Sequence, residues 1–96
     1  MKFRKKPVVV YATQWIKAGD HPAVEMCWFD ANGRIRWAPG DPESINVHGC
    51  TQQPAIRTLE GWHEVTAGDW IIAGIRGEFY PCKPDIFKET YKLVED

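Results

Sequence analysis

Histidines and cysteines are the residues of this chain that could bind a metal ion. The chain has three of each. They are His21, His48, His63, Cys27, Cys50 and Cys82. Structural zinc sites combine two closely spaced ligand pairs, whereas only His48 and Cys50 stand close together here. We therefore predict no metal site, and the odd, widely spaced cysteines indicate thiols in a reducing compartment rather than a disulfide scaffold.

Cys82 is the thiol whose neighbours could activate it as a nucleophile. Lys83 follows it, and Pro84 suits the start of a helix. A cation and a helix N-terminus both lower the pKa of a thiol. However, spacing identifies no histidine to act as its base, and cysteine is among the most buried residue types. We therefore predict a structural role for Cys82 and no catalytic residue in the chain.

Carboxylates and glycines also have structural explanations. Asp69 follows Gly68 in a turn, and Asp85 would lie in the first turn of a helix, where the helix dipole favours negative charge. Asp41 and Glu43 give no acid–base pair. Neither GxGxxG nor GxxxxGK[ST] occurs, so the sequence predicts no nucleotide cofactor of those classes and no other cofactor.

Arginine, lysine and aromatic residues occur together in the hairpins that we expect. Arginine beside an aromatic ring is typical of sites that stack a base and hold a phosphate. The alternative is that tryptophan fills the core while arginine covers the solvated face. The chain has five tryptophans, which are hard to bury fully in 96 residues, so we expect some in a groove or a subunit interface. The predicted ligand-binding residues are Arg57, Trp62, Trp70, Arg76, Tyr80 and Lys83.

The N-terminal half contains a strand and a hairpin. We expect a strand over Pro7–Trp15, after a basic N-terminal arm at residues 1–6. Asn32-Gly33 predicts a type I′ turn, in which both central residues have positive φ. That turn places Trp28 opposite Trp37 and Phe29 opposite Arg36. A short helix over Ala23–Phe29 is the alternative.

A long loop of about residues 38–54 follows, with three prolines and little periodicity. A short strand over Ser44–Val47 could interrupt it. Long loops in small domains are uncommon and tend to be functional or mobile.

The C-terminal half alternates strands and turns. A hairpin turning at Glu60-Gly61 places Arg57 opposite Glu64. Trp70–Ile75 is continuously apolar, which favours a buried central strand, and Arg76-Gly77 forms the next turn. Pro81 indicates an edge strand or a strand end.

The last segment is expected to form a short helix and a closing strand. Pro84 suits the first turn of the helix, and Ile86 and Phe87 would point inward. The sequence YKLV, from Tyr91, would close the sheet. We therefore predict one mainly β (β-rich α+β) domain over residues 1–96. Its strands would form a small twisted antiparallel sheet or partly closed barrel with one short C-terminal helix.

Charge and hydropathy narrow the location and the partners. The net charge of −1 makes nucleic acid an unlikely partner, although a basic arm leaves it open. The apolar runs are short, and no small-residue cleavage site follows the basic N-terminus, so we expect neither a membrane span nor a signal peptide. These features, with the free thiols, indicate a cytoplasmic protein.

Segments near both ends of the chain carry a resemblance to a known family. RKKPVVVYATQW and GDHPAV near the N-terminus, and TLEGWHEVTAGDWIIAGIRGEFYPCKPDIFKETY near the C-terminus, resemble segments of small proteins of tailed phages and prophages. These segments cover a little over half of the chain, and the middle looks like the variable part of that family. The resemblance implies a phage-related origin and the cytosol of a bacterial host. It implies no established activity.

Three functions follow as hypotheses. The first is a non-enzymatic, homo-oligomeric binding protein that sequesters a small anionic, nucleotide-like ligand or inhibits a component of host defence. The second is a small nucleic-acid-binding β-barrel. The third is an adaptor that binds a host protein, because tryptophan and arginine dominate the energetics of protein interfaces.

Overall fold

The computed structural model describes residues 1–4, 8–41 and 47–94, and it has a mainly β fold. Strands hold 38% of the described residues and helix 8%, which confirms the expected fold class. In chain order, the elements are β1 (Tyr11–Gln14), β2 (Val24–Phe29), β3 (Ile35–Trp37), β4 (Thr51–Thr58), β5 (Gly61–Glu64), β6 (Trp70–Ala73), β7 (Phe79–Cys82) and α1 (Pro84–Thr90).

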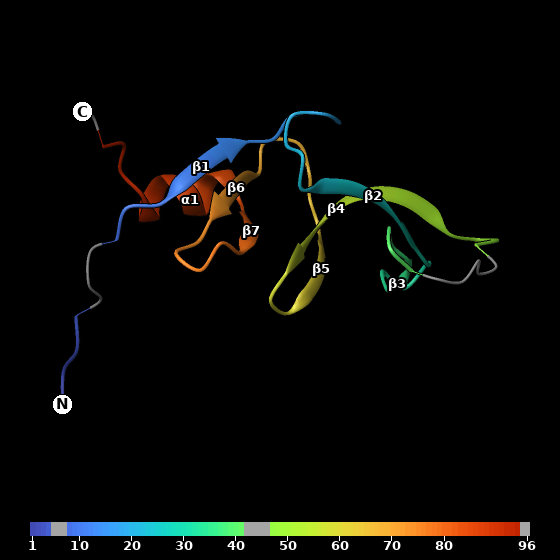
Figure 1. Cartoon of the computed structure of the whole chain (residues 1–96), viewed down its shortest axis with the longest axis horizontal. Coiled ribbons are helices and arrows are strands. Elements are labelled where there is room, and N and C mark those ends of the chain that lie inside the picture. The colour runs from blue at the N-terminus through green and yellow to red at the C-terminus, as the bar shows by residue number, and fades with distance from the viewer. Residues whose placement is uncertain (5–7, 42–46, 95–96) are drawn as a thin grey trace.

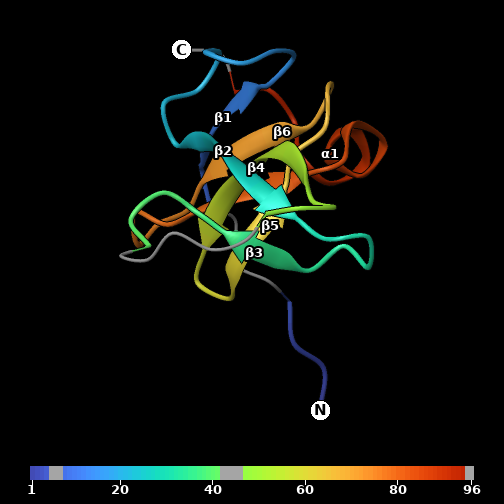
Figure 2. The ribbon, with the colours of Figure 1, turned by 90° about the vertical axis from the view of Figure 1, so that its right-hand side faces the viewer.

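The strands form two antiparallel sheets. The three-stranded sheet has the order β1-β6-β7, and the four-stranded sheet has the order β3-β2-β4-β5. Together they curl into half a barrel. Figure 1 shows the three-stranded sheet and α1 at the end that carries both termini, and Figure 2 looks onto the four-stranded sheet. The predicted central position of β6 and edge position of β7 are both confirmed.

The main core lies between the two sheets. Trp15, Ile56, Val65 and Ile71 are buried there, and Phe79 of β7 packs against them. Backbone hydrogen bonds hold Trp15 beside the β6 end of the sheet: its N–H donates to Asp69 O at 2.7 Å and its carbonyl accepts from Gly68 N at 2.8 Å. Burial of such large side chains is the main favourable contribution to folding.

A second core lies on the other face of the four-stranded sheet. Cys27, Phe29, Ala38 and Ala55 are buried there, and Trp62 packs against them. Adjacent residues of β4 therefore serve different cores, because side chains alternate between the faces of a strand. Ala55 belongs to this outer core, whereas the next residue, Ile56, belongs to the core between the sheets.

Aromatic side chains join α1 to the outer face of the three-stranded sheet. Phe87 stacks on Trp70 at a centroid distance of 4.2 Å, and on Tyr91 at 5.0 Å. The Tyr91 and Tyr80 hydroxyls are 3.3 Å apart. We call these four residues the aromatic row. Phe87 points toward the sheet as expected, but the prediction for Ile86 was wrong: it is 53% exposed, because a two-turn helix lays only one face on the sheet.

One buried carboxylate ties α1 to the turn before β6. Asp69 is 1% exposed. Its Oδ2 accepts the N–H of Thr66 at 2.9 Å, and its Oδ1 lies 3.1 Å from Lys83 Nζ. The ammonium group also donates to Thr66 Oγ1 at 2.7 Å. The predicted turn at residues 66–69 is thus confirmed, and the lysine supplies the partner that a buried carboxylate requires.

The first hairpin forms, but its turn differs from the prediction. Trp28 does pair with Trp37, so the helical alternative for this segment is wrong. However, Phe29 pairs with Ile35 and not with Arg36, because a bulge shifts the register. Among the described residues only glycines have positive φ, so Asn32 cannot adopt a type I′ turn.

The physical reason is a side-chain cap within the turn. The N–H of Gly33 donates to Asp30 O at 3.0 Å, and the Asp30 carboxylate accepts the N–H groups of Asn32 and Arg34 at 2.9 and 3.0 Å. A longer loop with one left-handed glycine and a bulge satisfies these bonds.

The second hairpin also has a different register. Arg57 pairs with Trp62, and Glu64 pairs with Ala55, so the expected Arg57–Glu64 pair is wrong. The shift is two residues, which leaves every side chain on its expected face. The expected loop of residues 38–54 also ends sooner, because β4 begins at Thr51. The proposed strand over 44–47 lies mostly outside the described residues, and Val47 is not in a strand.

Strand ends account for the remaining differences. The strand expected over residues 7–15 is shorter, since β1 covers only Tyr11–Gln14. β6 ends at Ala73, and Ile75 lies in the following turn. No strand forms over residues 91–94, because Tyr91 is used in the aromatic row instead. Hydrophobic residues that were expected in strands thus lie elsewhere: Val8 and Val9 before β1, Ile75 in a turn, and Tyr91 against Phe87 of α1.

Candidate functional site

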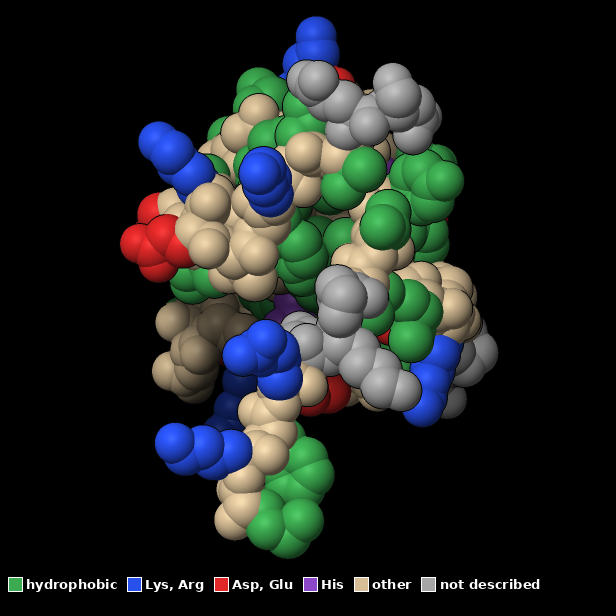
Figure 3. All heavy atoms as spheres, turned by 90° about the vertical axis from the view of Figure 1, so that its left-hand side faces the viewer, with side chains coloured by type: hydrophobic (Ala, Val, Ile, Leu, Met, Phe, Trp, Pro, Cys, Tyr) green, Lys and Arg blue, Asp and Glu red, His purple; other side chains and the backbone are tan. Residues whose placement is uncertain are grey.

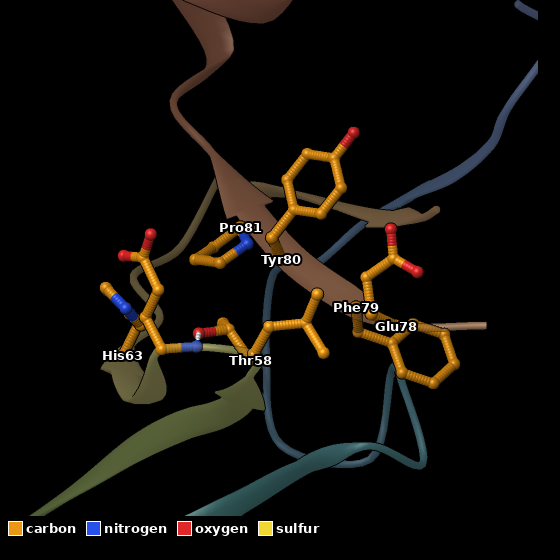
Figure 4. A pocket seen from close by; sticks show the side chains of 8 residues that line it. Thr58, His63, Glu78, Phe79, Tyr80 and Pro81 are labelled. Atoms are coloured by element: carbon orange, nitrogen blue, oxygen red, sulfur yellow. Dashed lines mark hydrogen bonds between the residues drawn. The ribbon is translucent and has the colours of Figure 1, made fainter. Parts of the chain in front are cut away.

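A cleft of about 310 Å³ lies between the two sheets, where the β4–β5 hairpin faces β7. The hairpin contributes Thr58, Leu59, Glu60 and His63, and the other wall is formed by Glu78, Phe79, Tyr80 and Pro81. Figure 4 shows His63 and Glu78 at opposite ends of the cleft, with Pro81 on the side of β7 toward the hairpin and the Tyr80 ring pointing away from it. The cleft continues the interface between the sheets, because Phe79 also packs against the main core.

Local hydrogen bonds position the hairpin wall. The hydroxyl of Thr58 donates to Gly61 O at 2.9 Å and accepts the N–H of Glu60 at 3.1 Å. Gly61 has a φ of 112°, a conformation that side-chain-bearing residues rarely adopt. These bonds fix the two-residue tip formed by Leu59 and Glu60, whose side chains border the cleft.

A second cap positions the β7 wall. The Glu78 carboxylate accepts the N–H of Arg76 at 3.0 Å, and the Glu78 carbonyl accepts the N–H of Gly74 at 2.8 Å. The carboxylate lies over Gly74 so closely that a Cβ at residue 74 would overlap it. A glycine at this position therefore allows Glu78 to fold back over its own turn.

Aromatic contacts fix the other β7 residues. His21 packs edge-on against Phe79 at a centroid distance of 5.2 Å, and His21 Nδ1 accepts the N–H of Ala23 at 3.0 Å. Burial lowers the pKa of His21. Burial, the hydrogen bond to Tyr91 and nearby negative charge raise the pKa of Tyr80 to about 12, so its hydroxyl keeps its proton at neutral pH.

The lining of the cleft is acidic and apolar. It contains the carboxylates Glu60 and Glu78, and no Lys or Arg is among the described residues that form it. Leu59, Phe79 and Pro81 supply apolar surface. His63, Thr58 and Tyr80 supply groups that can form hydrogen bonds.

The structure places only one of the six predicted ligand-binding residues, Tyr80, in the cleft. Arg57 and Trp62 pair across β4 and β5, on the face that carries the outer core. Arg76 is exposed in the turn before β7. The structure thus brings together Arg57 with Trp62, but not the whole predicted set.

Trp70 and Lys83 take part in contacts within the protein. One face of the Trp70 ring is covered by Phe87. The Lys83 ammonium is bonded to Asp69 and Thr66. Figure 3 shows Lys and Arg side chains spread over one face of the molecule rather than gathered in one patch.

Seven cleft residues were missed by the sequence analysis. They are Thr58, Leu59, Glu60, His63, Glu78, Phe79 and Pro81. They come from two hairpins in different sheets, and no local pattern indicates that those hairpins face each other. The usable signal was a pair of turns that each carry a glutamate beside an apolar residue, Leu59-Glu60 and Glu78-Phe79.

The thiols lie outside the cleft. Burial raises the pKa of Cys27 to about 11. Burial, Asp69 and Asp85 raise the pKa of Cys82. Lys83, the neighbouring cation that could have lowered it, is bonded to Asp69 instead. A raised pKa lowers the fraction of thiolate, which is the nucleophilic form of cysteine.

Comparisons with known proteins give no further guide to the site. No cluster of metal-ligating side chains occurs among residues 1–4, 8–41 and 47–94. In the same part of the chain, no helix is long and apolar enough to cross a membrane. The chain matches no family model, no curated protein and no solved structure.

Proposed function

We propose that this protein is a non-enzymatic binding protein that holds a small ligand or a side chain of a partner in the cleft between β7 and the β4–β5 hairpin. The observation that carries the proposal is the cleft itself, whose volume is about 310 Å³. Binding sites for small molecules are concave, have volumes of roughly 300–1,000 Å³, and combine apolar walls with a few polar groups. This cleft has that composition, at the small end of the range.

Binding without chemistry fits the positions of the reactive groups. The three cysteines are not among the residues that line the cleft. Among the described residues, no hydrogen bond connects His63 to a thiol or a carboxylate, which would be the arrangement of an activated nucleophile. These features support recognition over turnover.

The small anionic ligand that the sequence suggests has less support from the geometry. It would need several cations around one space. Arg57 instead lies on the face of the four-stranded sheet that carries the outer core. Arg76 lies in a turn, and Lys83 forms an ion pair with Asp69. Separated cations can each hold a counterion, but they do not focus potential on one ligand.

The origin of the protein is part of the proposal. The support is the resemblance of the two ends of the chain to proteins of tailed phages and prophages. We therefore propose that it acts in the cytosol of a bacterial host, as an accessory protein that captures a host component. Inhibition of host defence is one such role, as an analogy only.

A pair of exposed leucines gives a direct test. Leu59 lines the cleft and is 76% exposed, and Leu93, outside the cleft, is 81% exposed. Leu59→Arg should block the cleft with little cost to folding, and Leu93→Arg makes the same chemical change elsewhere. Protein purified from host cells would be analysed by native mass spectrometry for co-purifying molecules. A bound species lost only in Leu59→Arg supports the proposal.

Two results would contradict this proposal. One is a bound species that both variants retain. The other is backbone NMR signals of the cleft residues that stay unchanged when host metabolites or host proteins are added to the wild type.

A second candidate function is a protein adaptor, favoured by one exposed face. Trp28 and Trp37 pair across β2 and β3, and Met26, two residues away on the same face, is 37% exposed. Met26→Glu should abolish capture of a host protein, or dissociate the homo-oligomer that the sequence predicts. Pull-down and sedimentation velocity distinguish these outcomes. An unchanged result in both would exclude this face.

A further inference from the structure

We infer that the cleft recognises an alkylammonium or guanidinium group carried on an apolar stem. This inference rests on the proposed function, because it names the chemistry of the ligand for the same cleft. The ligand is then a cation, whereas the arginine, lysine and aromatic residues of the sequence suggested an anion.

The first argument is charge. Glu60 and Glu78 line the cleft, and no Lys or Arg side chain does so among the described residues. Two carboxylates at the border of a space with apolar walls favour a cation there over a phosphate or carboxylate.

The second argument is the nature of the walls. Phe79 presents an aromatic ring, and Leu59 and Pro81 present aliphatic surface. A cation within about 6 Å of an aromatic ring gains roughly 0.5–2 kcal/mol from the ring quadrupole. The aliphatic groups can cover the methylene stem of the same ligand, which a small inorganic cation lacks.

The third argument is the fixed position of one carboxylate. Glu78 is held over its own turn by the N–H of Arg76 and by the space above Gly74. That single bond leaves further acceptor positions on the carboxylate, because each carboxylate oxygen can accept more than one hydrogen bond. Glu60 has no such side-chain bond among the described residues and lies on the exposed hairpin tip. One carboxylate is therefore preorganised, and the other can adjust to the ligand.

Two sources could supply this chemistry. One is a free polyamine, and the other is a lysine or arginine side chain of a partner protein. Both present a cation on a chain of methylene groups, and both are consistent with a cleft of about 310 Å³.

The experiment uses three probes with the same stem. Pentylamine, pentanol and pentanoate differ only in their head group. Each would be titrated into the ¹⁵N-labelled full chain at neutral pH, and the amide signals of residues 58–63 and 78–80 would be followed. We expect pentylamine to bind most tightly and pentanoate most weakly.

Matched variants test the role of the carboxylate. Glu60→Gln should weaken pentylamine binding by about two- to fivefold, the size of an exposed ion pair. Glu25→Gln makes the same change on the face of β2 that carries the outer core, and should have no effect. Added salt should weaken binding to the wild type and have less effect on Glu60→Gln.

The outcomes separate this inference from the proposed function. Tighter binding of pentanol or pentanoate at the cleft would overturn the inference and leave a binding cleft in place. If none of the three probes shifts the cleft signals, the inference fails. The Leu59→Arg result then decides the proposed function by itself.

Comparison of spermidine with a lysine-containing peptide and its acetyl-lysine form identifies the source. Binding of the peptide but not of spermidine, lost on acetylation, indicates a partner protein. Binding of spermidine alone indicates a free polyamine. Equal affinity for the lysine and acetyl-lysine peptides would contradict recognition of a cation.

Discussion

The two sheets are held by different kinds of side-chain contact. In the three-stranded sheet, these contacts join residues that are far apart in the sequence, as in Lys83 to Asp69 and in the stacking of Phe87 on Trp70. In the four-stranded sheet, the side-chain bonds are mostly caps within one turn, as at Asp30 and Thr58. Both sheets share the main core. Beyond it, the first sheet is stabilised by contacts between distant residues, and the second by its turn caps and the outer core.

This difference determines how far a local change spreads. Loss of a contact between α1 and the three-stranded sheet removes support from elements on both sides of that contact. Loss of a turn cap in the four-stranded sheet affects one hairpin, because the capped groups are neighbours in sequence. The following changes test this distinction, from the largest expected effect to the smallest.

Truncation of the middle of the aromatic row should be the most damaging change. Phe87→Ala removes the ring that stacks on both Trp70 and Tyr91. Phe→Ala costs roughly 3–5 kcal/mol in a full core, and Phe87 is only partly buried, so we expect about 2–3 kcal/mol in urea unfolding. Phe3→Ala, at an exposed position, should cost almost nothing. Equal unfolding midpoints for the two variants would contradict the role of the row.

Removal of the cation beside Asp69 should come next. Lys83→Met leaves a buried carboxylate with the N–H of Thr66 but without its cation. Breaking a fully buried pair costs roughly 3–5 kcal/mol. Because the lysine is half exposed, we expect a smaller loss of stability, about 1–3 kcal/mol. Lys88→Met on the exposed side of α1 is the control. The same loss in both variants would show that Asp69 needs no ion partner.

Removal of a turn cap should have a smaller and more local effect. Asp30→Ala leaves the N–H groups of Asn32 and Arg34 without their side-chain acceptor. We expect a small drop in the urea midpoint, with faster hydrogen exchange limited to β2 and β3. Asp30→Asn keeps an acceptor and should resemble the wild type. Faster exchange throughout both sheets would contradict a local role.

The Asp30 cap should also depend on pH. The hydrogen bonds from Arg34 and Asn32, together with nearby arginines, lower the pKa of Asp30 below its usual value of 3.8. Its contribution to stability is therefore present above that value and is lost as the pH falls through the lowered pKa. Asp30→Asn should lack this part of the acid dependence, which urea unfolding at several acidic pH values would measure.

The smallest effect is expected at His21, where the two sheets meet. Burial lowers its pKa below 6.5, so the folded protein binds fewer protons than the unfolded chain as the pH falls through this region. The free energy of unfolding should therefore decrease as the pH falls from above 6.5 through the lowered folded-state pKa. His21→Asn can still accept the N–H of Ala23 and should show a flatter profile. A steeper profile in the variant would contradict this assignment.

The sequence predicts what depends on neighbouring residues. Gly-Asp, Asn-Gly and Arg-Gly marked turns, and the apolar run from Trp70 marked the central strand of one sheet. The fold class and the short helix at Pro84 follow from the same local patterns. Register and turn type were less accurate, because the Asp30 cap and the tip at Leu59-Glu60 each change the number of loop residues.

The candidate site could not be predicted in the same way. Residue type pointed to Arg57, Arg76 and Lys83, because each could bind an anion. The fold instead pairs Lys83 with Asp69, and it assembles the cleft from two hairpins whose facing positions depend on how the sheets pack. Tyr80 is the predicted residue that borders the cleft, because β7 forms one of its walls.

The position of β4 restricts how the length of this chain can vary. Ala55 and Ile56 are consecutive, and each fills a different core. One residue inserted between them would turn the rest of the strand over and place each side chain in the wrong core. Residues added before Thr51 would lengthen the connection to β4 and leave both cores intact. Insertions and deletions are therefore expected to be tolerated before this strand and eliminated within it.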